Sequence, residues 1–262
     1  VGAGTDKTTW QLRAPQAKHG GDGWCDYSFK NSDSITFQDM TVVGSVYPDG
    51  TTRIDNTQGL AYINHITLKD CVFNGRADYW GYVSTTFDHV TFNAPGTAES
   101  GISNTDYSVW TYTGKTYTFK DCTFNSNGRT INVYRNASSE DGSDSGSCND
   151  VTVYFENCTV NSIDAKEVSK AAKTALNIND SNRGDFKFII NISGNNTVDA
   201  ALDSTTCSRV FGFGGKEKES VNNSGRTEVY VNGKHVWGKK DDVQKGELKT
   251  HESSAGEAEH QV

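Results

Sequence analysis

The sequence contains very little proline and methionine and has no long apolar run. Only 3 Pro and 1 Met occur among 262 residues, and the longest apolar runs, such as Phe188-Ile189-Ile190, fall far short of the ~18–20 residues that cross a bilayer. We therefore expect no membrane span. Basic side chains are also outnumbered, with 25 Lys and Arg against 33 Asp and Glu, and they form no cluster. This argues against DNA or RNA as a partner, because nucleic-acid binding depends on a basic patch.

The six cysteines lack the spacing of a metal site. No Cys-x-x-Cys pair occurs, and no histidine lies near a cysteine at zinc-ligand spacing. We therefore predict neither a metal nor another cofactor. The abundant residues are Thr, Asn, Asp, Ser and Val, together with 11 Tyr and 12 Phe. This composition indicates β-strands connected by many turns.

A short segment recurs five times, and its copies align without a gap. They are Phe37–Val42, Leu68–Asn74, Phe87–Asn93, Phe119–Asn125 and Phe155–Asn161, with a looser sixth copy at Phe186–Val198. One equivalent position is held by Met40, Cys71, Val90, Cys122 and Cys158, so the step varies from 19 residues (71 to 90) to 36 residues (122 to 158). Repetition on this scale is typical of solenoids, in which each repeat forms one coil.

Each copy predicts two short strands joined by a bend. Side chains of a strand alternate between its faces, so Cys122 and Phe124 point one way while Asp121 and Thr123 point the other. Phe119 is out of phase with this alternation. A bend between Phe119 and Cys122 would let both strands turn apolar residues toward a narrow core.

Two residue types recur at positions that stacking would bring together. Four copies end in asparagine, at Asn74, Asn93, Asn125 and Asn161. At the ~4.8 Å strand spacing their amides could bond as a ladder, and Asn also suits a tight bend. Cys71, Cys122 and Cys158 share an inward position and predict stacked core thiols. Cys122 and Cys158 lie on neighbouring coils, so a disulfide between them is the alternative.

A weaker repeat follows the first and predicts a further strand in each coil. Its members are residues 79–83, 109–112, 130–134, 174–179 and 209–213. The segment 163–173 is rich in helix formers and predicts a short helix on a loop.

The recurring Phe-x-Asp/Asn-Cys-Thr-Phe-Asn signature, over about residues 35–213, resembles the right-handed parallel β-helix proteins of the pectate-lyase-like superfamily. The resemblance implies an all-β fold of stacked coils. It also implies either polysaccharide lyases and hydrolases or catalytically silent bacterial surface proteins and adhesins. Fold alone therefore leaves the chemistry open.

We divide the chain into four parts on this basis. They are an N-terminal cap (1–34), the parallel β-helix (35–213), a C-terminal hairpin cap (214–238) and a disordered tail (239–262). The hairpin is expected at Thr227–Trp237, which contains the favoured Asn-Gly turn. The tail is charged and lacks aromatic residues.

Candidate catalytic residues are sparse. The hydrolases of the resembled superfamily share Asn-Thr-Asp, Asp-Asp, Gly-His-Gly and Arg-Ile-Lys motifs, of which Asn104-Thr105-Asp106 stands alone here. The alternative activity is a calcium-dependent uronate lyase, in which Arg76 or Arg129 would withdraw a proton, with Asp78 and Asp106 within reach. These residues are more simply read as solvated turn residues, and we predict no enzyme.

Aromatic side chains recur within the weaker repeat, at Tyr79, Trp80, Tyr82, Trp110, Tyr112 and Tyr134. Parallel stacking would align them along one face, and aromatic residues dominate binding hot spots. We therefore predict a monomeric bacterial module, secreted or attached to the cell wall. Its partner would be a host protein, such as an immunoglobulin or mucin, or a glycan. Burial of these aromatics under inserted loops would instead favour a structural stalk or spacer.

Overall fold

The structure is a computed structural model, and its description covers fifteen stretches of the chain. They are residues 1–11, 27–28, 32–43, 60–61, 63–74, 81, 83–93, 108–111, 114–126, 129–133, 150–162, 174–178, 187–199, 210–213 and 227–237. All regular elements within these stretches are β-strands. No helix in the described part of the chain has the length and apolar character needed to cross a bilayer. The helix expected at 163–173 and the tail at 239–262 lie outside the described residues.

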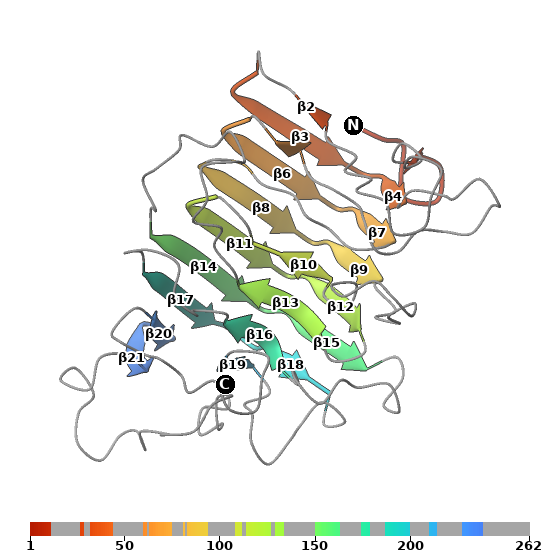
Figure 1. Cartoon of the computed structure of the whole chain (residues 1–262). Coiled ribbons are helices and arrows are strands. Elements are labelled where there is room, and N and C mark those ends of the chain that lie inside the picture. Colours follow the sequence, from red (N-terminus) through yellow and green to blue (C-terminus); the bar gives the residue numbers. More distant parts are fainter. Residues whose placement is uncertain are drawn as a thin grey trace, which may run out of the picture.

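Most strands belong to three sheets (Figure 1). The eight-stranded sheet consists, in chain order, of β3 (Ser34–Gln38), β6 (His65–Lys69), β8 (Ser84–Asp88), β11 (Thr116–Lys120), β14 (Val151–Glu156), β17 (Phe188–Ser193), β20 (Thr227–Val231) and β21 (Lys234–Trp237). The seven-stranded sheet consists of β1 (Thr9–Gln11), β4 (Thr41–Val43), β7 (Val72–Asn74), β9 (Thr91–Asn93), β12 (Thr123–Ser126), β15 (Thr159–Ser162) and β18 (Thr197–Val198). The four-stranded sheet consists of β10 (Val109–Trp110), β13 (Arg129–Val133), β16 (Thr174–Ile178) and β19 (Phe211–Phe213). A separate pair is formed by β2 (Tyr27–Ser28) and β5 (Leu60–Ala61).

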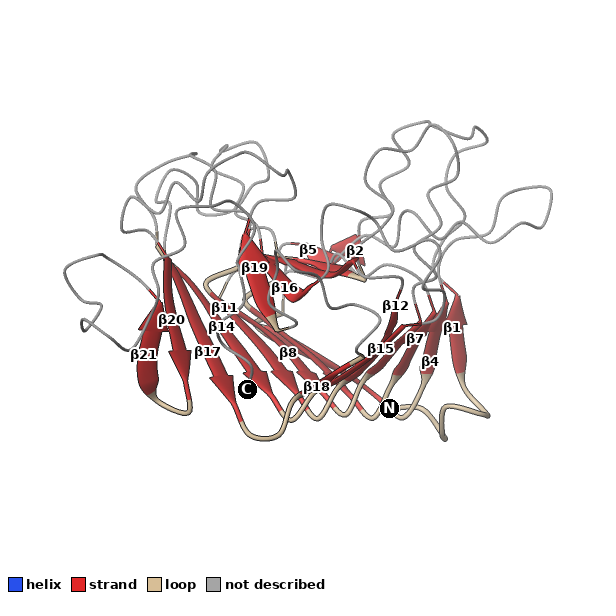
Figure 2. Cartoon of the chain, turned by 90° about the horizontal axis from the view of Figure 1, so that it is seen from below, coloured by secondary structure: helices blue, strands red, loops and turns tan. Residues whose placement is uncertain are grey.

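Successive coils stack in register, which confirms the parallel β-helix. Each coil adds one strand to the eight-stranded sheet and the next strand to the seven-stranded sheet, and every pairing in the three sheets except that of β20 with β21 is parallel. Phe87, Phe119 and Phe155 are direct neighbours in adjacent strands. Figure 2 shows the two larger sheets meeting along a row of short turns, with β16 and β19 on the third side of the coil.

The predicted bend is present in all five copies. The bend residues are Asp39, Asp70, His89, Asp121 and Asn157, with φ between 51° and 56°. This left-handed conformation is more accessible to Asp, Asn and His than to most residues. The asparagines that end four of the copies, however, do not adopt the left-handed conformation of a tight bend, which corrects one sequence expectation: they lie in or at the ends of the strands that follow the bend.

Those asparagines form the predicted ladder. The Nδ2 of Asn93 donates to Asn74 Oδ1 at 2.8 Å, Asn125 donates to Asn93 at 2.7 Å, and Asn161 donates to Asn125 at 3.0 Å. A second, buried amide pair joins Asn177 to Asn132 at 3.0 Å in the four-stranded sheet. Both sets therefore connect one coil to the next.

The core consists of stacked aromatic and aliphatic rows. Phe92 and Phe124 stack with ring centroids 4.8 Å apart, and Phe87 and Phe119 stack at 5.1 Å. All four side chains are fully buried. Burial of each such ring stabilises the fold by roughly 1.5–3 kcal/mol relative to leaving it exposed.

The predicted row of core thiols is also present. Cys71, Cys122 and Cys158 are buried and free, and each thiol donates to the carbonyl oxygen two residues earlier at 3.1–3.3 Å. Side chains that are direct neighbours on parallel strands have Cβ atoms about 4.8 Å apart, which exceeds the ~3.5–4.5 Å of a disulfide. The free thiols therefore fit the register of the coils. Cys25, Cys148 and Cys207 lie outside the described residues.

The sixth copy accommodates one additional residue at its bend. Gly194 (φ +71°) occupies the left-handed position, where a Cβ would collide with Oδ1 of Asn157. The longer bend places the side chain of Asn196 beside the preceding coil. The Oδ1 of Asn196 accepts a hydrogen bond from the backbone N–H of Cys158 at 2.8 Å. The side chain thus supplies an acceptor to the preceding coil.

The expected hairpin follows this copy. Strands β20 and β21 pair antiparallel, and Asn232 and Gly233 both have positive φ, 49° and 78°. This is the Asn-Gly turn of a two-residue hairpin. At the other end of the chain, β1 pairs with β4 and extends the seven-stranded sheet before the first copy.

Candidate functional surface

Of the residues predicted from sequence to bind or to catalyse, the described structure includes only the backbone of Trp110 and that of Arg129. The backbone of Trp110 lies in β10 and that of Arg129 in β13, which are paired neighbours in the four-stranded sheet. Their side chains lie outside the described structure. So do the remaining predicted residues, Tyr79, Trp80, Tyr82, Tyr112, Tyr134, Arg76, Asp78 and Asp106. These assignments stay predictions.

The described structure instead presents the outer face of the eight-stranded sheet. Because alternate side chains point away from the core, each strand contributes the same positions to rows that run across the sheet. The central row contains Thr36, Thr67, Thr86, Thr118, Tyr154, Asn191 and Tyr230. This row therefore changes from hydroxyl groups to aromatic and amide groups at β14.

Tyr154 is the most prominent side chain of the row. Its relative exposure is 44%. Asn191 lies directly beside it on β17, and Tyr230 lies beside Asn191 on β20. The two tyrosines are thus two strand spacings, ~9.6 Å, apart. We call Tyr154, Asn191 and Tyr230 the tyrosine face.

Charged groups fix one end of the tyrosine face. The Tyr230 hydroxyl donates to Glu228 Oε2 at 2.8 Å, and Lys187 Nζ lies 3.5 Å from Glu228 Oε1. The hydrogen bond from Tyr230 holds the pKa of Glu228 below its usual value, and the charge of Lys187 acts in the same direction. The His235 ring lies 5.1 Å from the Tyr230 ring. Tyr230 is therefore held in one orientation, while Tyr154 is more open.

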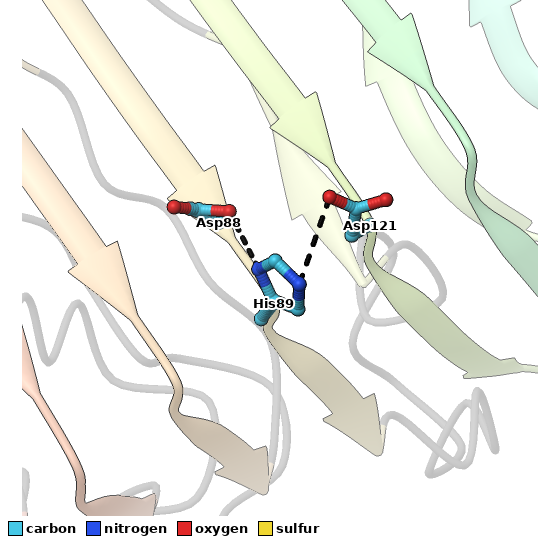
Figure 3. Close-up of side chains that lie close together, drawn as sticks. All are labelled: Asp88, His89 and Asp121. Atoms are coloured by element: carbon cyan, nitrogen blue, oxygen red, sulfur yellow. Dashed lines mark hydrogen bonds and ion pairs between the residues drawn. The ribbon is translucent and has the colours of Figure 1, made fainter. Parts of the chain in front are cut away.

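A second group of polar side chains lies on the ridge of turns between the two larger sheets (Figure 3). Asp88 ends β8, His89 forms the bend that follows it, and Asp121 forms the bend of the next coil. His89 Nδ1 lies 2.7 Å from Asp88 Oδ1, and His89 Nε2 lies 3.6 Å from Asp121 Oδ2. His89 is 56% exposed, so its side chain points outward into solvent. Within the described part of the chain they form the group of three possible metal ligands whose ligand atoms all lie within 4.8 Å of one another.

The core thiols are poor candidates for chemistry. Burial raises the pKa of Cys71 and, more strongly, that of Cys122. Only a thiolate is an effective nucleophile or metal ligand, and the raised pKa keeps Cys71 and Cys122 protonated at neutral pH. Their role is therefore packing and hydrogen bonding within the coil.

Sequence reasoning missed the tyrosine face because its members are far apart in the chain. Tyr154 lies in Val151–Glu156, whose alternation already places it opposite the buried Val153 and Phe155. That signal could have been found. The pairing of Tyr154 with Asn191 and Tyr230 requires the register of three strands, which the sequence alone leaves open.

The comparisons with known proteins add no family to this picture. No protein-family model matches the chain, and neither a curated protein nor a solved structure shows significant similarity to it.

Proposed function

We propose that this protein is a non-catalytic binding module of the adhesin type, secreted or attached to a bacterial cell surface, that recognises the glycans of a host macromolecule. The observation that supports the proposal is the tyrosine face on the outside of the eight-stranded sheet. A mucin or an immunoglobulin is a partner that carries such glycans. The module acts as a monomer, since one copy supplies the whole face.

Sugar recognition fits the chemistry of this face. The flat apolar side of a pyranose ring packs against an aromatic ring, and its hydroxyl groups bind amides and carboxylates. Tyr154 offers an exposed ring, Asn191 offers both a donor and an acceptor, and Glu228 is an ionised acceptor beside Tyr230. With two rings ~9.6 Å apart, the face is wide enough for more than one sugar unit.

The rigidity of the coil favours this role as well. The face is built on strands that pair on both sides, so its side chains are held before a partner arrives. A surface that is already ordered spends little of its binding free energy on ordering. The six aromatic residues predicted from the weaker repeat form a separate candidate surface.

Binding of the whole chain to immobilised mucin glycans, uronate polysaccharides and immunoglobulins, each before and after enzymatic deglycosylation, tests the proposal. We expect binding that is lost on deglycosylation and weakened about tenfold or more by Tyr154→Ala, since losing a central aromatic contact costs upwards of ~1.4 kcal/mol. Tyr154→Phe retains the ring and should bind almost as the wild type. Thr36→Ala, in the same central row but four strands away from Tyr154 on β3, is the matched surface control.

Two results would contradict the proposal. Binding unchanged in Tyr154→Ala would remove the tyrosine face from the partner's site, and the parallel variant Trp110→Ala would then show whether the other aromatic set carries it. Formation of unsaturated uronate in the presence of calcium, lost in Arg129→Ala, would replace the binding module with a lyase.

A further inference from the structure

The arrangement of Asp88, His89 and Asp121 fixes which nitrogen of the imidazole carries the proton. The Asp88 carboxylate can only accept a hydrogen bond, and it lies 2.7 Å from His89 Nδ1. The proton of a neutral imidazole must therefore be on Nδ1. It follows that Nε2 of neutral His89 presents a lone pair.

That lone pair faces a second carboxylate. Asp121 belongs to the next coil and lies beside His89, because Asp88 and Lys120 are direct neighbours in β8 and β11. Its Oδ2 is 3.6 Å from Nε2, which is too long for a hydrogen bond. A lone pair opposite a carboxylate is repulsive unless a positive charge lies between or near them. Either a proton on Nε2 or a cation bound by both atoms would remove this repulsion.

We propose that His89 Nε2 and Asp121 Oδ2 together bind a divalent transition-metal ion, with Zn²⁺ as the best fit. Two ligands about 2.1 Å from a tetrahedral ion are about 3.4 Å apart, close to the separation seen here. One imidazole nitrogen with one carboxylate oxygen suits Zn²⁺ better than Ca²⁺ or Mg²⁺, which take oxygen ligands. Water completes the coordination, since the site is open to solvent.

Asp88 acts in this site as a positioning residue. Metal-bound histidines commonly donate their other ring N–H to a carboxylate, which fixes the tautomer and increases the basicity of the ligand. The Asp88–His89 contact has this form. The bend residues on either side do not complete the set: Asn157 uses its Oδ1 to accept from the backbone N–H of Asn195, and Asp70 lies on the far side of His89.

A metal at this position would join two adjacent coils at the ridge. His89 follows β8 and Asp121 follows β11, so the ion bridges segments that the chain itself connects only through residues 90–120. The site lies at the ends of β8 and β11, whereas the tyrosine face begins at β14. The inference therefore does not depend on the proposed function.

Isothermal titration of the whole chain with zinc chloride at pH 7.5 tests the proposal. We expect one site that is lost in His89→Asn and in Asp121→Asn. Asp88→Asn should weaken it by roughly 10–100-fold, the usual effect of removing a carboxylate that orients a metal-bound histidine. His65→Asn is the matched control, since His65 lies on the same sheet with its Nδ1 2.8 Å from the Ser84 hydroxyl. Zinc binding should be unchanged in that variant.

A second measurement distinguishes zinc binding at His89 from zinc binding at other histidines. In ¹⁵N-edited NMR of the imidazole groups, zinc should shift the Nε2 signal that disappears in His89→Asn, while Nδ1 stays protonated. Identical zinc isotherms for the wild type and His89→Asn would overturn the proposal. So would a His89 ring that carries protons on both nitrogens at pH 7.5 and does not respond to zinc, or equal affinity for calcium chloride.

Discussion

Replacing an inner rung of the asparagine ladder should destabilise the coil more than replacing its end. Asn125 donates to Asn93 at 2.7 Å and accepts from Asn161 at 3.0 Å, so Asn125→Ala removes two hydrogen bonds. Asn161→Ala removes only the second of them. A side-chain hydrogen bond contributes about 0.5–1.5 kcal/mol net. We therefore expect a loss of about 2 kcal/mol in the free energy of unfolding for Asn125→Ala and about 1 kcal/mol for Asn161→Ala.

Urea unfolding followed by circular dichroism measures both values, and an unchanged m-value would show that the same surface is exposed. The ladder can be probed further with Asn125→Asp. An ionised carboxylate cannot donate to Asn93, but a protonated one can, so the native state raises the pKa of the introduced group. The deficit relative to the wild type should therefore be largest at neutral pH, shrink as pH falls through the raised native pKa, and be smallest below the unfolded value of about 4. Equal losses for Asn125→Ala and Asn161→Ala, or a deficit in Asn125→Asp that does not respond to pH, would refute the reasoning.

Three further outcomes follow from the structure. Phe124→Ala should lower the free energy of unfolding by about 3–5 kcal/mol and Phe124→Leu by much less, measured by urea titration, because the ring is fully buried between stacked neighbours. Gly194→Ala should be more damaging than Gly233→Ala in thermal unfolding: both residues have positive φ, but only at Gly194 does an added Cβ meet another side chain, whereas Gly233 has open space around it. The lowered pKa of Glu228 means that its contribution to stability is complete above the unfolded value of about 4.5 and is lost as pH falls through the native value. The stability difference between the wild type and Glu228→Gln should therefore be present at pH 7 and vanish in acid; a constant difference would contradict this assignment.

The repeated part of the fold could be predicted from the sequence because the same pattern occurs in several copies. Phe119 and Cys122 have the wrong spacing for one continuous strand, and this mismatch alone required a bend between them. The structure places Asp121 there with φ 51° and buries both Phe119 and Cys122. The alternation of each strand predicted which side chains enter the core. The equivalent residues of the other copies gave the same assignment.

The identity of the left-handed residue was less accessible. Asparagine, aspartate and histidine all tolerate this backbone conformation, and four of the five copies contain such a residue both at the bend and at the end of the copy. In the fourth copy these are Asp121 and Asn125. The first makes the bend, and the second remains extended because its amide bonds to the neighbouring coils. That choice depends on contacts between copies, which one copy by itself does not contain.

The candidate sites arise where single copies depart from the repeat. Tyr154 replaces the threonine of the four preceding coils in the central row, and His89 replaces an aspartate in the row of bends. Neither change contributes to packing of the core, since both side chains point outward. A parallel β-helix places such residues at fixed positions without altering the coil that carries them. The departures from the repeat, rather than the repeat itself, are therefore where a binding or metal site of this chain is to be sought.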